Sequence, residues 1–140
     1  MTLPQKLEQI LLELEEQDSD SKAQMLIEFA EEFEEVPSNI AIRPFEESHR
    51  VPACESEAFI WSIKDPDQKY KFYFAVENPQ GISAKAMAVI LELGLSGETA
   101  ESIRAVPDEI AYRIFGRGLS MGKGAGLMSM IRVVKALTIK

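Results

Sequence analysis

Cysteine and histidine are nearly absent from this sequence, which has one of each. A single cysteine cannot close a disulfide within the chain, and the two residues together fall short of the four ligands of a structural zinc site. Long apolar runs are also missing, since none approaches the ~20 residues of a membrane span. The first residues lack the cationic and apolar segments of a signal peptide. We therefore expect a cytoplasmic protein with no membrane partner.

Basic residues are fewer than acidic ones: the chain has 15 lysines and arginines and 23 aspartates and glutamates, which gives a net charge of −8. Such a chain is poorly suited to bind nucleic acid or an anionic membrane, because both need a basic surface. Eleven acidic residues and one basic residue, Lys22, lie between Leu7 and Glu35. They are either the solvated faces of two amphipathic helices or a docking surface for a basic partner.

The length and composition fit one domain with its own core. The chain has 140 residues, of which 46% are hydrophobic and 27% charged, and both values are ordinary for a globular protein. No internal repeat, low-complexity tract or domain boundary interrupts the sequence. We expect a single domain over residues 1–140 that buries about two-thirds of its unfolded surface.

Two amphipathic helices are predicted in the first 35 residues. Thr2 followed by Gln5 has the pattern of a capping box and predicts the start of the first helix. Residues 17–21 offer turn and N-cap chemistry, so a second helix should follow them. The apolar faces would consist of Leu7, Ile10, Leu11 and Leu14 in the first helix and of Leu26, Phe29, Ala30 and Phe33 in the second.

A β-hairpin is predicted in the middle of the chain. Residues 58–63 and 70–76 have the β-branched, aromatic and alternating patterns of strands, and residues 65–68 supply the turn between them. A short strand at 49–51 would pair on the other side of the first strand. Cys54 would then sit at the tip of the turn that joins these two strands.

The rest of the chain is predicted to be helical. A helix over 83–93 would end at Gly94, and short helical segments would follow at 97–105 and 107–115. Ser120 is expected to cap the last helix, whose inner face would consist of Leu127, Met130, Ile131, Val134 and Leu137. The predicted fold class is α+β, with several helices packed against a small antiparallel sheet.

Cys54 is the side chain best suited to nucleophilic chemistry. From the residues alone it is either a buried, inert cysteine or a reactive thiol on an exposed loop. His49, five residues earlier, could activate the thiol, but a catalytic pair also needs an orienting group and an oxyanion hole. A partly exposed strand histidine is the simpler interpretation.

The glycine-rich segment 116–126 invites comparison with a phosphate-binding loop. That motif needs glycine where Arg117 stands and serine or threonine where Gly124 stands, and it follows a strand, which is not predicted here. We interpret the segment as a flexible connection into the last helix.

The order of elements and several short motifs resemble the SufE-like sulfur-acceptor family. Val51, Cys54 and Ser56 match the family's loop pattern of Val, two residues, Cys, one residue and Ser. Gly126-Leu127 and Met130-Ile131 match its signature in the last helix. The resemblance covers nearly the whole chain.

The chain departs from the family pattern at four places. Ala53 stands where the family commonly has Gly, and Phe59 where it has Trp, although Trp61 should point to the same face as Phe59. Residues 79–81 replace a Ser-Asp-Ala segment. Lys123 replaces an Arg, which keeps the charge but loses bidentate geometry.

The resemblance implies a SufE/IscU-like α+β fold and a sulfur carrier. Cys54 would accept a sulfane sulfur as a persulfide from a cysteine desulfurase of the SUF system. The protein would also stimulate that enzyme and deliver the sulfur to an iron–sulfur scaffold complex. Val51, Glu55, Ser56 and Lys123 would make loop and partner contacts. No metal or cofactor is expected on this chain, because pyridoxal phosphate would belong to the desulfurase.

The residues agree with a carrier in one respect: the chain has no second cysteine that could discharge a persulfide as a disulfide. On this interpretation the protein is an acceptor and activator rather than an enzyme. Two alternatives stay open. One is a noncatalytic adaptor that regulates a desulfurase without carrying sulfur, and the other is a self-standing thiol enzyme, which the single histidine disfavours. We also expect Cys54 to be partly sheltered in the free protein.

Overall fold

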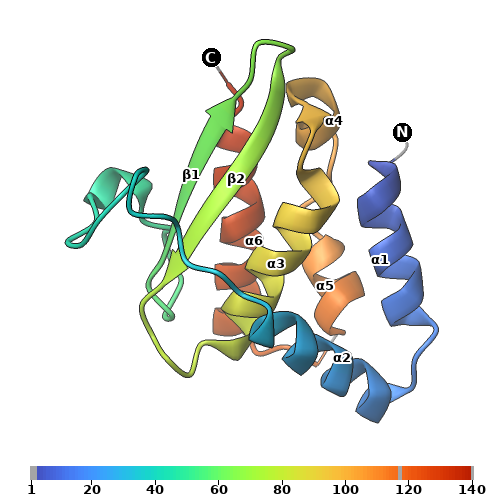
Figure 1. Cartoon of the computed structure of the whole chain (residues 1–140). Helices are drawn as coiled ribbons and strands as arrows, with labels where there is room; N and C mark the ends of the chain where they lie inside the picture. Colours follow the sequence, from blue (N-terminus) through green and yellow to red (C-terminus); the bar gives the residue numbers. More distant parts are fainter. Residues whose placement is uncertain (1–2, 117, 140) are drawn as a thin grey trace.

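A three-stranded antiparallel sheet is packed against helices on one face and covered by an extended segment on the other (Figure 1). The computed structural model describes residues 3–116 and 118–139. This arrangement confirms the predicted α+β class. The elements in chain order are α1 (Gln5–Glu15), α2 (Ser19–Glu31), the 3₁₀ helix η1 (Glu47–His49), β1 (Ala58–Lys64), β2 (Lys69–Val76), α3 (Ile82–Leu95), β3 (Glu98–Thr99), α4 (Ala100–Arg104), α5 (Ile110–Phe115) and α6 (Met121–Ala136).

The hairpin of β1 and β2 is the centre of the sheet, as predicted. Its register pairs Ala58 with Val76 and Lys64 with Tyr70, and β3 pairs with the other edge of β2. In the turn, the Asp65 carboxylate accepts hydrogen bonds from two backbone N–H groups further along the turn, at 2.9 and 3.0 Å. Such a side-chain contact fixes a turn locally.

The strand predicted at 49–51 does not form, although this segment does lie beside the first strand of the hairpin as predicted. Residues 47–49 form η1, and only Arg50 makes an antiparallel bridge, to Phe59. Because a single bridge holds this segment to β1, the chain approaches the sheet without becoming a fourth strand.

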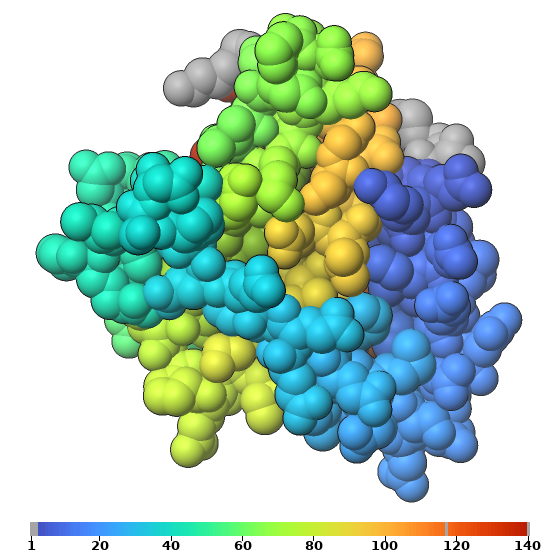
Figure 2. Space-filling model, viewed as in Figure 1, coloured from blue at the N-terminus to red at the C-terminus, as the bar shows by residue number. Residues whose placement is uncertain are grey.

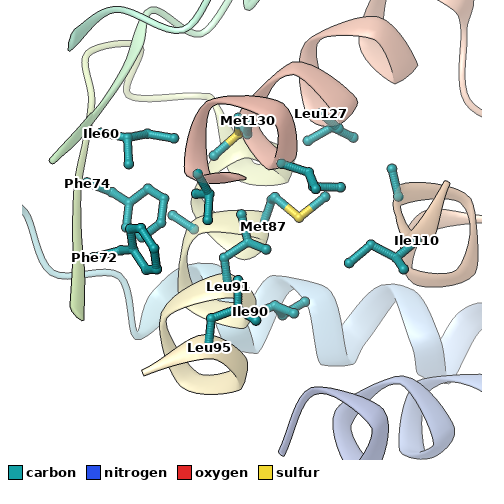
Figure 3. Close-up of a cluster of buried hydrophobic side chains, with 14 of the residues drawn as sticks. Ile60, Phe72, Phe74, Met87, Ile90, Leu91, Leu95, Ile110, Leu127 and Met130 are labelled. Atoms are coloured by element: carbon teal, nitrogen blue, oxygen red, sulfur yellow. The ribbon is translucent and has the colours of Figure 1, made fainter. Parts of the chain in front are cut away.

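The main core lies between the sheet and the helices (Figure 3). Nine residues of α3 are buried, so this helix is apolar on most of its circumference, as a central helix must be. Gly94 does not end the helix, contrary to the prediction. It lies inside α3 where α1 packs, and a Cβ there would stand 2.9 Å from the Cβ of Leu7. The positive φ of 82° belongs instead to Gly97, beyond the helix end.

Residues 36–49, called the strap from here on, cover the opposite face of the sheet. The strap continues from the end of α2 and crosses β1 and β2 (Figures 1 and 2). Its Phe45 ring packs on Phe59 and Trp61 at centroid distances of 5.3 and 5.0 Å. Phe59 and Trp61 therefore point to the same face, as predicted, and a second small core forms beneath the strap.

The two N-terminal helices differ in how deeply they pack. The structure buries Leu7, Leu11 and Leu14 of α1, whereas no residue of α2 is buried and its predicted apolar stripe is only partly covered. Asp18 caps α2 by accepting a hydrogen bond from the Ser21 N–H at 2.8 Å. Helix α1 begins at Gln5, with Pro4 in the N-cap position and no cap from the Pro4 side chain. Thr2 lies outside the described residues.

Ser120 caps α6 as predicted, and its hydroxyl accepts a hydrogen bond from the Lys123 N–H at 3.2 Å. The predicted inner face of this helix is buried except at Leu137, which is partly exposed. No helix in the described part of the chain has both the length and the apolar character needed to cross a bilayer.

Candidate functional site

Cys54 lies in a short loop, residues 51–57, which we call the Cys54 loop. The Val51 N–H donates a hydrogen bond to the Ala58 carbonyl at 2.8 Å, next to the bridge that joins the strap to β1, and closes the base of the loop. Inside the loop, the Glu57 N–H donates to the Cys54 carbonyl at 3.1 Å. The thiol therefore lies where the chain reverses between two paired segments, as the sequence predicted.

The backbone of the Cys54 loop is strained on both sides of the cysteine. Ala53 has φ 61° and Glu57 has φ 55°, both in the left-handed region that residues with a Cβ rarely adopt. Ala53 stands where the SufE resemblance expects glycine, and the positive φ explains that preference. Alanine holds this conformation at a cost of about 1 kcal/mol.

A pocket of about 430 Å³ opens beside the thiol. Three parts of the chain that are far apart in sequence form its walls: the Cys54 loop, the segment that leads into α3, and the first turns of α6. Its lining residues are Cys54, Glu55, Ser56, Asn78, Gln80, Gly81, Ile82, Ser83, Ala84, Gly122, Lys123, Gly126 and Leu127.

Two glycines allow these walls to approach the Cys54 loop. A Cβ on Gly126 of α6 would lie 3.0 Å from the Ala53 carbonyl oxygen and 3.3 Å from the Cys54 Cα. A Cβ on Gly81 would lie 2.8 Å from the Ser56 hydroxyl oxygen. Real Cβ atoms do not come so close unless the neighbouring atoms move away. The absence of side chains at these two glycines therefore lets the Cys54 loop pack against both walls.

The structure brings four of the five sequence-predicted site residues together. Cys54, Glu55, Ser56 and Lys123 line the same pocket. Cys54 is half-buried and packs against the edge of the main core, which agrees with the expected partial shelter. Val51 differs, because its side chain is 1% exposed and belongs to the core. In this conformation Val51 anchors the loop rather than facing a partner.

Sequence reasoning missed the second loop of the site, residues 77–81. The Glu77 N–H donates to the Glu57 carbonyl at 3.2 Å, and the Asn78 N–H donates to the Ser56 carbonyl at 3.1 Å. These bonds extend the β1–β2 pairing onto the Cys54 loop. Asn78-Pro-Gln-Gly81 has the composition of a turn before a helix, but no signal in the sequence indicates which loop it contacts.

His49 lies apart from the thiol. Its Nδ1 is 3.0 Å from the Ile60 carbonyl oxygen, and its ring stacks on Trp61 at a centroid distance of 5.2 Å. The ring therefore belongs to the strap side of the sheet and does not line the Cys54 pocket. It is a partly exposed residue of η1 rather than of a strand.

The glycine-rich segment is a connection into a helix, as interpreted from the sequence. It follows α5 rather than a strand, Gly116 has φ 86°, and residues from Met121 onward are helical. Arg117 lies outside the described residues. Within residues 3–116 and 118–139, no three His, Cys, Asp or Glu side chains form a group that could hold a metal ion.

A larger hollow, of about 810 Å³, lies between α1 and the segment around α5. It is crossed by ion pairs, since Arg113 contacts Glu15 at 2.8 Å and Glu8 at 3.4 Å. Cys54 does not line this hollow. The smaller pocket beside Cys54 is therefore the candidate functional site.

The chain was compared with protein families, curated proteins and solved structures. Residues 8–138 match the family described as SufE, Fe-S metabolism associated domain. An uncharacterized SufE-like protein of Mycobacterium tuberculosis, found in strains CDC 1551 / Oshkosh and ATCC 25618 / H37Rv, is 28% identical over 108 residues, which cover 77% of this chain and 73% of the relative. The solution structure of a hypothetical protein from Thermus thermophilus superposes with a TM-score of 0.75 and 25% identity over 98% of this chain and 96% of that one.

The family match, which covers most of the chain, associates this protein with iron–sulfur metabolism. The chain belongs to the SufE family, as the resemblance in the Cys54 loop and in the last helix had indicated.

Proposed function

We propose that this protein is a sulfur carrier that holds sulfur as a persulfide on Cys54. The donor is a cysteine desulfurase that carries its own pyridoxal phosphate, and the recipient is an iron–sulfur scaffold complex. The observation that carries the proposal is the half-buried thiol of Cys54 in a pocket walled by the Cys54 loop, the start of α3 and α6.

The transfer step is a thiol exchange that needs no added oxidant or reductant. The Cys54 thiolate attacks the terminal sulfur of the donor's persulfide, the donor's S–S bond breaks, and the donor cysteine leaves as a thiolate. A new S–S bond now joins the transferred sulfur to Cys54. Because the chain has no other cysteine, nothing within it can attack the new persulfide to form a disulfide.

The walls of the pocket suit a sulfur atom that carries negative charge for part of this cycle. Lys123 brings a cationic side chain to the lining, and Ser56 brings a hydroxyl. Glu55 lines the same pocket and works against an anion. Partial burial keeps small thiols from the bound sulfur, and a partner that binds the extended loop would select the state that presents it.

A Cys54→Ser variant separates a carrier from an adaptor. Serine cannot hold a sulfane sulfur, whereas an adaptor that only contacts the desulfurase would tolerate this near-isosteric change. We expect the variant to fold with an unchanged thermal midpoint and to lose stimulation of desulfurase turnover. Full stimulation by the Ser variant would contradict the carrier mechanism and favour the adaptor.

A further inference from the structure

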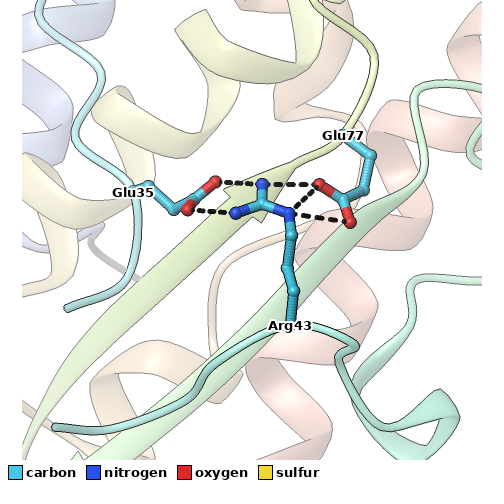
Figure 4. Close-up of polar contacts among 3 residues, drawn as sticks. All are labelled: Glu35, Arg43 and Glu77. Atoms are coloured by element: carbon cyan, nitrogen blue, oxygen red, sulfur yellow. Dashed lines mark hydrogen bonds and ion pairs between the residues drawn. The ribbon is translucent and has the colours of Figure 1, made fainter. Parts of the chain in front are cut away.

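Arg43, in the strap, bridges two carboxylates from different parts of the fold (Figure 4). Its Nη1 and Nη2 atoms donate to the two oxygens of Glu35 at 2.7 and 2.5 Å. Its Nη2 and Nε atoms donate to Glu77 Oε1 at 2.6 and 3.0 Å. The hydrogen bond from Arg43 holds the pKa of Glu35 below its usual range. A lysine could not make this double contact, because it lacks the planar fork of donors.

Both carboxylates are attached to ordered backbone. Glu35 precedes Val36, the first residue of the strap, which is buried and whose N–H donates to the Phe74 carbonyl of β2 at 2.8 Å. Glu77 directly follows the last residue of β2. The guanidinium is half-exposed, yet its position is fixed on one side by the start of the strap and on the other by the end of the hairpin.

The Glu77 backbone holds the Cys54 loop. The Glu77 and Asn78 N–H groups donate to the carbonyls of Glu57 and Ser56, and these two bonds join the second loop of the site to the loop that carries the thiol. The same residue is thus held by Arg43 through its side chain and holds the Cys54 loop through its backbone. A chain of direct contacts leads from the strap to the pocket wall.

We infer that Arg43 is a positioning residue for Cys54. By fixing Glu77, it keeps residues 77–78 against the Cys54 loop and keeps the thiol half-buried. The benefit of this positioning rests on the proposed sulfur-carrier function, since a docked Cys54 loop protects a persulfide from small thiols. The experiment that tests the positioning does not depend on that function, because opening of the loop is measured on the free protein.

The test is the rate at which iodoacetamide alkylates Cys54 in the full chain at fixed pH. Losing an exposed ion-pair network weakens local structure modestly, so we expect about three- to fivefold faster alkylation in Arg43→Gln and in Glu77→Gln. Arg43→Lys should fall between these variants and the parent. Arg132→Gln is the matched control, because Arg132 pairs with Asp108 at 2.7 Å with a comparably exposed side chain and does not line the Cys54 pocket. Its rate should not change.

A second readout separates positioning from general stabilisation. Repeating the measurement in urea below the unfolding transition distinguishes local loop opening, whose rate depends little on urea, from global unfolding, whose population rises steeply with it. A urea-independent increase in Arg43→Gln supports the inference. An unchanged rate, or an increase that follows urea as global unfolding does, overturns it. Either result leaves the proposed sulfur transfer to be judged by its own experiment.

Discussion

Gly126 lies so close to the backbone of Ala53 that a side chain could be added only if the backbone shifted: a Cβ on Gly126 would stand 3.0 Å from the Ala53 carbonyl oxygen. The contact joins α6 to the residue that precedes Cys54. The place of the thiol is therefore set by a helix more than sixty residues away in sequence. Gly122, one turn earlier in α6, would meet nothing within 4 Å if it carried a Cβ. A substitution at Gly122 therefore serves as the control for the same substitution at Gly126.

We predict that Gly126→Ala displaces the Cys54 loop. The added methyl group must push away the backbone at Ala53 and Cys54, so Cys54 should be alkylated several-fold faster. The gain in helix propensity, up to about 1 kcal/mol, should be cancelled by this collision. Gly122 also lines the Cys54 pocket, but its added methyl group would touch nothing, so Gly122→Ala should not speed the alkylation. Equal rates in both variants would show that the close approach does not seat the loop.

The backbone conformation at Ala53 gives a stability prediction. Glycine adopts a positive φ without the steric cost that alanine pays, while it loses more entropy on folding. We expect Ala53→Gly to raise the free energy of unfolding by about 0.5 kcal/mol. Ala23→Gly, at an exposed position within α2, should lower it by about 1 kcal/mol. Urea titrations measure both, and a loss of stability in Ala53→Gly would contradict the strained conformation.

The acidic N-terminal stretch should affect the rate of partner encounter more than the affinity. Exposed charges at the rim of an interface mainly set association rates and salt dependence. We predict that neutralising Glu31, Glu32 and Glu34 together weakens binding to the desulfurase by about tenfold or less at low salt. Glu35 must be left out, because it bonds Arg43 rather than facing solvent alone. Binding kinetics at two salt concentrations provide the measurement. Complete loss of binding at physiological salt would place the interface at the C-terminal end of α2 and the residues that follow it.

The ion pair between Arg113 and Glu15 gives a pH dependence. The hydrogen bond from Arg113 lowers the pKa of Glu15 from its ordinary value. A carboxyl group whose pKa is lowered in the folded state stabilises the protein above the unfolded pKa and loses that effect as the pH falls through the folded pKa. The thermal midpoint should therefore drop below about pH 4.5, and the drop should be shallower in Arg113→Gln. The same slope in both proteins would contradict this contribution.

Local patterns predicted the elements that depend on local contacts. The hairpin, the cap at Ser120 and the buried face of α1 follow from alternation, capping chemistry and helical periodicity. The family motif around Cys54 also indicated which loop carries the thiol. Each of these features is encoded within a few neighbouring residues.

Long-range contacts explain what the sequence did not reveal. Gly94 has the composition of a helix end, but it lies inside α3 because Leu7 of α1 needs the space above it. Arg43 and Glu77 carry no local pattern that pairs them, and the second loop of the site was missed for the same reason. Which distant segments meet is decided by packing of the whole chain.

The most direct test of the central claim is the mass of Cys54 after the protein is incubated with a cysteine desulfurase and free cysteine. Peptide mapping under non-reducing conditions should show a gain of about 32 Da, one sulfur atom, on the peptide that contains Cys54. The gain should disappear after treatment with a reducing thiol, and it should not form when the desulfurase is omitted. An unmodified Cys54 in a protein that still stimulates the desulfurase would contradict the persulfide account.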